Sequence, residues 1–276
     1  ESVITASADR VSAPCPHYGT CGGCALQHLA PTAQLGFKQA QLLENLARLG
    51  SVEPQRVLEP LAGPIWGYRR RARLGIKYVP RKGRVLVGFR ERAAPFVADL
   101  HECRVLAAPL GSLFDPLAEL IGGLSIAARV PQAEVAVADN ACALVLRVLD
   151  PPTDVDLERM RQWEREHDAR LYLQPGGPAS VAPLTPGHAP LRYALPEFDV
   201  TLEFEPTDFI QVNGALNAAM VSRAVAVLDP QPGERVLDLF CGLGNFSLPL
   251  ARKAGQVVGL EGEPGLVARA THNATR

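Results

Sequence analysis

The sequence lacks long apolar runs and lacks an excess of charge of either sign. No stretch of the 276 residues reaches the ~18–20 apolar residues that a membrane span needs, and no apolar run near the start is typical of a signal peptide. The formal net charge of −1 by itself indicates no polyanionic partner. Hydrophobic residues make up 47% of the chain, enough to form a core. We therefore expect a cytoplasmic monomer with no membrane partner.

Cysteine is scarce, yet three of the six cysteines fall within ten residues. Cys15, Cys21 and Cys24 have the spacing C-x5-C-x2-C, and the glycines between them let the loop fold back on itself. In a reducing compartment clustered thiols more often bind metal than pair as disulfides. A tetrahedral sulfur site needs a fourth ligand, and Cys103 is the best candidate. Four thiolates suit either a [4Fe–4S] cluster or structural zinc.

Other interpretations of the cysteines stay open at this point. The thiols could be buried and free, although three in ten residues with interleaved glycine are hard to explain by packing. A zinc site could use His17, His28 or His101 in place of one sulfur, but zinc ribbons more often contain two C-x2-C pairs. Cys142 lies in an alternating apolar segment and is better explained as part of the core.

Residues 66–92 concentrate positive charge, with ten Lys and Arg and a single acid. Strict alternation over residues 71–79, a turn at 80–83 and a second apolar segment near 84–90 predict a β-hairpin. The candidate RNA contacts in this segment are Arg69, Arg70, Arg71, Arg73 and Lys77.

A cationic stripe of this kind neutralises phosphates and gives nucleic-acid affinity without sequence preference. Trp66, Tyr68 and Phe89 are available to stack on bases of single-stranded RNA. The alternative is a solvated strand face whose cations pair with acids elsewhere in the chain. The concentration of charge on one hairpin favours nucleic acid.

Between these segments the pattern is mixed. An amphipathic helix is expected over 34–49 and a second hairpin over 133–149. Thr153 or Asp154 is a candidate cap for a helix that runs to about residue 167, and a short apolar strand follows near 170–173. Six prolines between positions 175 and 196 then predict a loop-rich connector.

Beyond the connector the pattern predicts the start of an α/β domain. Helices near 213–228 and 246–254 alternate with apolar strands at 235–240 and 256–260. That order is typical of a doubly wound parallel sheet.

The turn after the first of these strands has the features of a nucleoside-binding loop. Gly242 and Gly244 let a ligand approach the backbone, and a carboxylate at Glu261 can accept bonds from ribose hydroxyls. The third glycine of a dinucleotide fingerprint is replaced by Ser247, and Asp238 suits a cationic ligand with a sulfonium and an amino group. The pattern favours S-adenosyl-L-methionine over a nicotinamide cofactor, and a structural glycine turn is the remaining alternative.

Taken together, these segments resemble the bacterial iron–sulfur RNA (uracil-C5)-methyltransferases, closest to members that modify 23S ribosomal RNA. The resemblance covers nearly all of residues 15–276 and rests on CPHYGTCGGCALQH (15–28), WGYRRRARL (66–74), DFIQVN (208–213), RVLDLFCGLGNFSLPLA (235–251) and VVGLEG (257–262). It implies an α+β RNA-binding and iron–sulfur domain, followed by the N-terminal part of an α/β Rossmann-like S-adenosylmethionine methyltransferase domain.

The resemblance also implies the site residues and the partner. It assigns Cys15, Cys21, Cys24 and Cys103 to a [4Fe–4S] cluster, and Gln211, Phe240, Asn245 and Glu261 to the methyl donor. The partner that it implies is ribosomal RNA.

In the family a cysteine thiolate adds to C6 of uracil, the methyl group goes to C5, and a carboxylate removes the C5 proton. The Ser-Cys-Asn-Pro-like nucleophile motif and the late glutamate base do not occur in this sequence, and Cys241 corresponds to a cysteine of the cofactor turn. We therefore expect a chain truncated at both ends, with no catalytic residue and no turnover of its own.

The expected organisation is a linker remnant at 1–14, an iron–sulfur and RNA-binding central domain at 15–205, and the N-terminal part of the methyltransferase domain at 206–276. Helix 34–49 is expected to pack on the methyltransferase domain. Two further hypotheses remain: a metal-bearing RNA-binding module without catalysis, and a nicotinamide-linked redox protein with an iron–sulfur centre.

Overall fold

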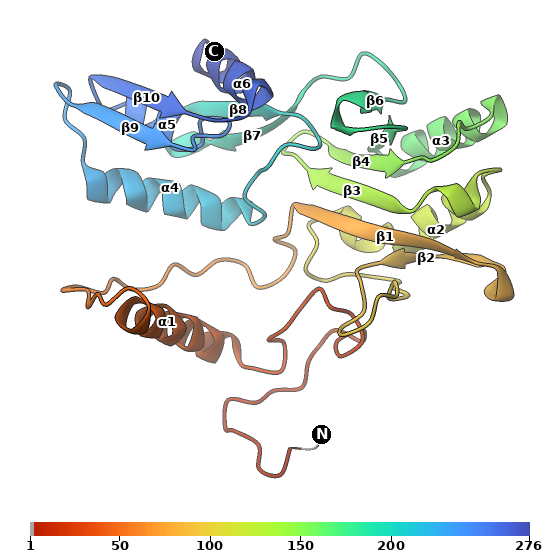
Figure 1. Cartoon of the computed structure of the whole chain (residues 1–276), viewed down its shortest axis with the longest axis horizontal. Coiled ribbons are helices and arrows are strands. Elements are labelled where there is room, and N and C mark those ends of the chain that lie inside the picture. Colours follow the sequence, from red (N-terminus) through yellow and green to blue (C-terminus); the bar gives the residue numbers. More distant parts are fainter. Residues whose placement is uncertain (1–2) are drawn as a thin grey trace.

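The backbone is organised around three β-sheets (Figure 1). The computed structural model describes residues 3–276. The largest sheet has the strand order β2-β1-β3-β4-β5-β6; β4 and β5 run parallel, and the other neighbours are antiparallel. Its strands are β1 (Arg71–Val79), β2 (Arg84–Gly88), β3 (Gln132–Val137), β4 (Cys142–Arg147), β5 (Ala169–Gln174) and β6 (Ala182–Pro183).

The two hairpins expected from the alternating pattern are confirmed. In β1 the side chains of Ala72, Leu74 and Ile76 are buried, whereas Arg73 and Lys77 are exposed. A period of two places successive side chains on opposite faces, so the apolar set enters the core and the cations face solvent.

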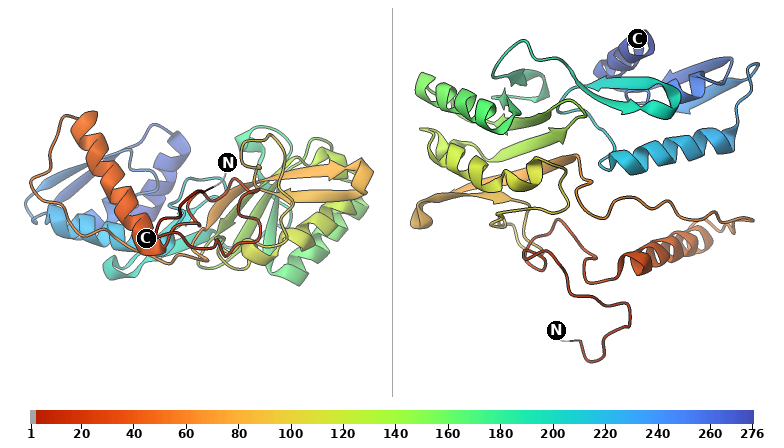
Figure 2. Two further views of the ribbon diagram at one scale, coloured as in Figure 1. Left: turned by 90° about the horizontal axis from the view of Figure 1, so that it is seen from below. Right: turned by 180° about the vertical axis from the view of Figure 1, so that it is seen from behind.

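Helices α2 (Phe114–Gly122) and α3 (Asp154–His167) cover one face of this sheet, with α2 against β2 and α3 against β5 (Figures 1 and 2). Helix α3 begins at the predicted cap. Thr153 Oγ1 accepts from Asp156 N, and the Asp156 carboxylate accepts from Thr153 N, so two end amides of the helix are satisfied reciprocally. The buried apolar residues of this sheet and of α2 and α3 form a first core, and Cys142 is buried in it, as expected.

A second core joins the other two sheets. Strands β7 (Leu191–Leu195) and β8 (Val200–Phe204) form an antiparallel hairpin, and β9 (Arg235–Leu239) pairs in parallel with β10 (Gln256–Leu260). The helices of this part are α4 (Gly214–Leu228), α5 (Ser247–Ala251) and α6 (Pro264–Ala274). The predicted β-α-β order is confirmed. The core comprises mainly Leu191, Tyr193, Leu195, Leu202, Phe204, Val221, Val225, Leu243 and Leu250.

Some elements differ from the sequence expectation. The proline-rich connector gives way to β7 already at Leu191, because alternating apolar residues outweigh the prolines around them. Helix α5 ends at Ala251, three residues early, since Gly255 N must reach Glu234 O (3.0 Å) to start β10. Helices α2 and α6 were not anticipated. The hairpin β7–β8 packs in the second core, and the proposed boundary at 205–206 stays a prediction.

Helix α1 (Pro31–Arg48) lies apart from both cores, and none of its residues is buried (Figures 1 and 2). It corresponds to the helix expected over 34–49. The segment after it reaches α4, where Arg223 Nη1 donates to Glu59 O (2.6 Å). Packing of α1 itself on the C-terminal α/β part stays a prediction. Across residues 3–276, no helix has the length and apolar character required to cross a bilayer.

Candidate functional site

The four cysteines proposed as ligands, Cys15, Cys21, Cys24 and Cys103, line one cavity. Its lining also includes the apolar side chains of Tyr18, Phe89 and Leu100. Tertiary structure thus brings Cys103 to the N-terminal loop across about 80 residues of chain, and its role as a ligand stays a prediction. Burial raises the pKa of the Cys21 and Cys103 thiols, and the neighbouring cysteines raise it further.

Within residues 3–276, no three His, Cys, Asp or Glu side chains are arranged as ligands of a single metal ion. Zinc at ~2.3 Å from sulfur would hold four thiolates within about 4 Å of one another. Two of the histidines weighed as zinc ligands are engaged elsewhere: His28 Nδ1 lies 2.6 Å from Tyr18 Oη, and His101 Nδ1 lies 2.8 Å from Asp115 Oδ1. The cysteines therefore share a cavity without forming a single-ion site.

The cysteine loop is fastened to the segment that follows β2. Gly22 N donates to Arg90 O (2.8 Å), and Arg92 N donates to Thr20 O (2.8 Å). A Cβ at Gly22 would lie 2.8 Å from Arg90 O, so only glycine allows this close approach of two backbones. Arg92 Nη2 also donates to Cys24 O (2.8 Å).

The structure separates the five predicted RNA contacts into two groups. Arg70 pairs with Asp139, and Arg71 lies 3.3 Å from Glu134 and donates to Thr207 O (2.5 Å). Both arginines are half-buried, and the carboxylates of Asp139 and Glu134 neutralise much of their charge.

The second group is open to solvent or lines a groove. Arg73 also pairs with Glu134 (2.6 Å), but its side chain is 68% exposed. Lys77 is exposed on the same strand face. Arg69 stacks over the Phe89 ring, 5.5 Å from its centroid.

The glycine turn lies at the carboxyl end of β9, beside the carboxyl end of β10. Glu261 Oε2 accepts from Gly242 N (3.0 Å), and Glu261 Oε1 accepts from Gly262 N (2.7 Å) and Glu263 N (3.1 Å). These three backbone bonds lower the pKa of the Glu261 carboxyl, which therefore stays ionised at neutral pH. Gly244 has φ +91°, a conformation that favours glycine.

Two further groups complete the surroundings of the turn. Asp238 Oδ2 accepts from Ser247 Oγ (2.6 Å), so the residue that interrupts the dinucleotide pattern orients the carboxylate. Phe240 is 87% exposed and has φ +62°, a strained conformation for a non-glycine residue at the mouth of the turn. Burial, Asp238 and Glu261 all raise the pKa of the Cys241 thiol, the opposite of what an activated nucleophile needs.

Asn245 is held by a residue that the sequence did not single out. Its amide forms two 2.9 Å bonds with Asn217 of α4, and its Oδ1 also accepts from Tyr193 Oη (3.1 Å). Asn217 and Tyr193 are both buried. The sequence signal that could have identified Asn217 is a polar residue on the buried face of a predicted helix.

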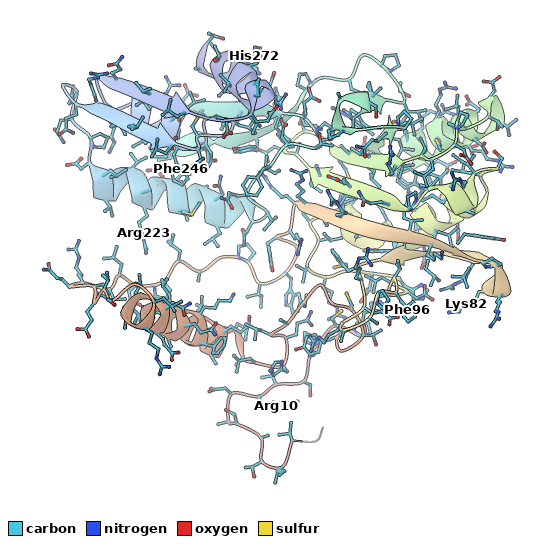
Figure 3. The ribbon with its side chains drawn as sticks, viewed as in Figure 1. Arg10, Lys82, Phe96, Arg223, Phe246 and His272 are labelled. Atoms are coloured by element: carbon cyan, nitrogen blue, oxygen red, sulfur yellow. The ribbon has the colours of Figure 1, made fainter. Side chains whose placement is uncertain are left out.

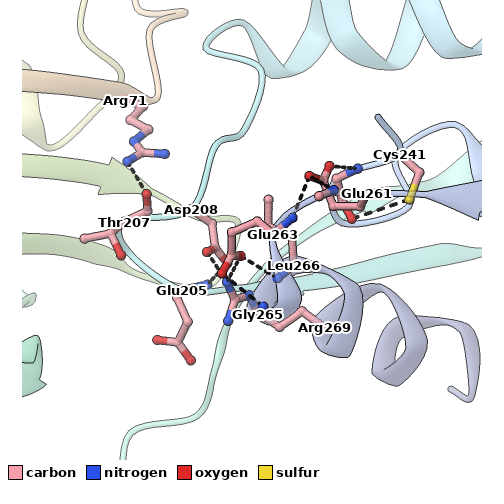
Figure 4. A network of polar contacts seen from close by, with 12 residues as sticks. Arg71, Glu205, Thr207, Asp208, Cys241, Glu261, Glu263, Gly265, Leu266 and Arg269 are labelled. Atoms are coloured by element: carbon pink, nitrogen blue, oxygen red, sulfur yellow. Dashed lines mark hydrogen bonds and ion pairs between the residues drawn. The ribbon is translucent and has the colours of Figure 1, made fainter. Parts of the chain in front are cut away.

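Gln211 is exposed and precedes the cap of α4, in the segment 208–213. Figure 4 shows how this segment is held: Arg269 of α6 donates to Asp208 Oδ1 (2.5 Å) and lies 3.9 Å from Glu263. Arg71 reaches Thr207 O from β1. The segment with Gln211 is therefore tied both to α6 and to the basic strand.

Comparison with known proteins agrees with this geometry. Over 275 residues the chain is 50% identical to the 23S rRNA (uracil(1939)-C(5))-methyltransferase RlmD of Aromatoleum aromaticum, covering 99% of this chain and 64% of that protein. It is 52% identical over 275 residues to RlmD of Alkalilimnicola ehrlichii, covering 99% of this chain and 62% of that protein. Residues 195–276 match the family described as tRNA (Uracil-5-)-methyltransferase. Over nearly its whole length, the chain is similar to RNA (uracil-C5)-methyltransferases.

The chain spans about 58–64% of the length of these relatives, RlmD of Bordetella avium included. Among solved structures, it superposes on the tRNA (uracil-54, C5)-methyltransferase of Pyrococcus abyssi in complex with S-adenosyl-L-homocysteine. The TM-score is 0.71 at 21% identity, covering 99% of this chain and 64% of that one. This likeness shows that the fold is that of the uracil-C5-methyltransferases.

Proposed function

We propose that the chain contributes methyl-donor binding and RNA binding to an S-adenosylmethionine-dependent enzyme that methylates uridine C5 in 23S ribosomal RNA. The observation that carries the proposal is the 50–52% identity to RlmD proteins over nearly the whole chain. The glycine turn at the carboxyl ends of two parallel strands agrees with it. Such an enzyme acts in the cytoplasm, and we expect a monomer.

S-adenosylmethionine would supply the methyl group when bound. Glu261 has lone pairs left for ribose hydroxyls after its three backbone bonds, and Phe240 offers an exposed ring to the adenine. Asp238 provides negative charge for the sulfonium and amino group, while Gly242 and Gly244 let the ligand approach the backbone. Gln211 and Asn245 complete the proposed set.

The cysteine cavity is proposed to hold the [4Fe–4S] cluster. Four thiols meet at one apolar cavity, which is the donor set that iron–sulfur clusters take. A cluster is larger than a single ion and keeps its sulfur ligands further apart, in agreement with a cavity that does not gather them around one ion. Because the cysteine loop is bonded to Arg90 and Arg92, a cluster there would also order the basic segment.

Catalysis itself is assigned to no residue of this chain. The nucleophile and base motifs do not occur in the 276 residues, and the environment of Cys241 disfavours its thiolate. As it stands, the chain would behave as the non-catalytic, metal-bearing RNA-binding module considered from the sequence. Incubation with tritiated S-adenosylmethionine and ribosomal RNA should give no labelled uridine, and label in uridine would contradict this assignment.

Calorimetric titration tests the cofactor assignment. We expect S-adenosyl-L-homocysteine to bind the purified chain and NADH to give no heat beyond dilution. Binding of NADH without binding of S-adenosyl-L-homocysteine would instead support the nicotinamide-linked alternative. Iron content under anaerobic conditions provides an independent measure of the cluster, treated in the Discussion.

A further inference from the structure

A large groove lies between the start of β1 and the loop that follows β2. Its volume is about 880 Å³, and its lining includes Arg69, Arg73, Arg90 and Arg92, with Glu91 as the acid among them. We call this the arginine groove. Arg73 of β1, Arg69 just before that strand and two residues of the loop after β2 thus place four guanidinium groups around one hollow. The loop residues were not among the RNA contacts predicted from the sequence.

Three of these arginines have no carboxylate partner within residues 3–276, unlike Arg70 and Arg71. Arg69 Nε donates to Arg71 O (3.0 Å), Arg90 Nη1 to Pro95 O (3.2 Å) and Arg92 Nη2 to Cys24 O (2.8 Å). Backbone carbonyls orient a guanidinium without neutralising it. The groove therefore keeps a net positive charge that an external anion can satisfy.

The groove also has aromatic surface. Phe89 is a partly buried ring that lines the groove beneath Arg69, and Phe96 lies outside the lining, on the adjoining loop, with 67% of its surface exposed (Figure 3). Guanidinium groups beside exposed aromatic rings are the features that bind the phosphates and unstacked bases of single-stranded RNA. A duplex hides its base faces and cannot use such rings.

We propose that the arginine groove binds a single-stranded segment of the RNA, with Arg69, Arg73, Arg90 and Arg92 on its phosphates. The proposal rests on the proposed function and deepens it: the contact surface is this groove and not the whole cationic stripe of β1. Arg70 and Arg71 instead join the strand to the rest of the chain.

The test uses fluorescence anisotropy with an oligouridylate of about 12 nucleotides, titrated at several salt concentrations. Each phosphate contact contributes about 0.7 to the slope of log K against log salt for a single strand. We expect Arg90→Gln with Arg92→Gln to weaken binding roughly tenfold at low salt and to lower the slope by about 1.4. Arg235→Gln, one exposed arginine at the far end of β9, should change neither quantity appreciably.

A gain-of-binding variant separates contact from misfolding. Glu91→Gln removes the carboxylate of the groove and should tighten binding about two- to threefold, a result that a damaged fold cannot give. Thermal unfolding of the double variant gives a second control, because Arg92 also bonds the cysteine loop. A hybridised duplex of matched length should bind more weakly than the single strand.

The outcomes distinguish the groove from the proposed function. RNA binding by the wild-type chain with an unchanged salt slope in the double variant would overturn the groove and leave the RNA-binding function standing. Equal affinity for the duplex would overturn the single-stranded assignment. Absence of RNA binding by the wild-type chain at low salt would overturn both, whereas S-adenosyl-L-homocysteine titration would still report on the methyltransferase assignment.

Discussion

Asn217 of α4 and Asn245 of the glycine turn bind each other through two amide hydrogen bonds of 2.9 Å. Tyr193 Oη adds a third bond to the same Asn245 oxygen, at 3.1 Å. A buried helix residue and a strand residue of the preceding hairpin therefore set the orientation of the turn.

Asn217→Ala should loosen the glycine turn. The change leaves the Asn245 amide short of partners in a buried setting, at a cost of about 1–3 kcal/mol in the free energy of unfolding. Tyr193→Phe removes one hydrogen bond and should cost about 1 kcal/mol. We expect the affinity for S-adenosyl-L-homocysteine to fall at least about fivefold in Asn217→Ala, because the glycine turn is then less well ordered.

Urea unfolding and calorimetric titration measure the two effects. Ser222→Ala, on the same helix, is the matched control and should leave both values close to those of the wild type. Unchanged affinity in Asn217→Ala, together with the expected loss of stability, would show that the amide pair has no part in cofactor binding.

Glu261→Gln should weaken cofactor binding and remove its dependence on acid pH. The carboxylate accepts from three backbone amides, and a glutamine amide group would place donors against those donors. Because the folded pKa of Glu261 lies below the ordinary 4.5, its contribution is fully present above that value. The contribution is lost as the pH falls through the depressed pKa.

Affinity for S-adenosyl-L-homocysteine should therefore stay level from pH ~8 to ~5 in the wild type. Glu261→Gln should bind about tenfold more weakly across this range. Glu197→Gln, an exposed acid in the turn between β7 and β8, serves as the control. A wild-type affinity that rises or falls steadily between pH 8 and 5 would contradict the assigned ionisation.

Arg71 and Arg73 share one acid, Glu134, but should respond differently to substitution. Arg71→Gln removes an ion pair and a bond to Thr207 O in a half-buried site, so we expect a loss of about 1–3 kcal/mol in the free energy of unfolding. Arg73 is mostly exposed, and its pair with Glu134 should contribute only about 0–1 kcal/mol.

RNA affinity should show the reverse order. Arg73 lines the arginine groove, so Arg73→Gln should lower the slope of log K against log salt by about 0.7. Arg71→Gln should leave this slope unchanged. The two variants control for each other, because each removes one arginine from the same strand. Equal salt slopes in the two would mean that the groove does not select among the arginines of β1.

Cys21→Ser and Cys103→Ser should each abolish iron binding. We expect about four iron atoms per wild-type chain after anaerobic purification, with the visible absorbance of an iron–sulfur cluster. Cys142→Ala is the control, because Cys142 is buried in the first core and lies outside the cavity. Zinc in place of iron, or neither metal, in the wild-type chain would rule out the cluster.

The sequence by itself determined the local elements and the resemblance to a family. Alternation over residues 71–79 predicted β1 to the residue, and Thr153 was one of the two candidate caps of α3, because period and capping act between neighbours in the chain. The glycine turn and its order between two strands were also predicted locally. The motif combination indicated uracil-C5 methylation, and the relatives agree.

Tertiary structure decided which side chains meet. Only the fold brings Cys103 to the N-terminal loop, pairs Arg70 and Arg71 with internal acids, and leaves Arg90 and Arg92 without an acidic partner in the described part of the chain. Contacts between residues far apart in the chain depend on how sheets and loops pack, and a pattern of neighbours does not encode that packing. For the same reason Asn217 emerged as a partner of the cofactor turn only from the structure.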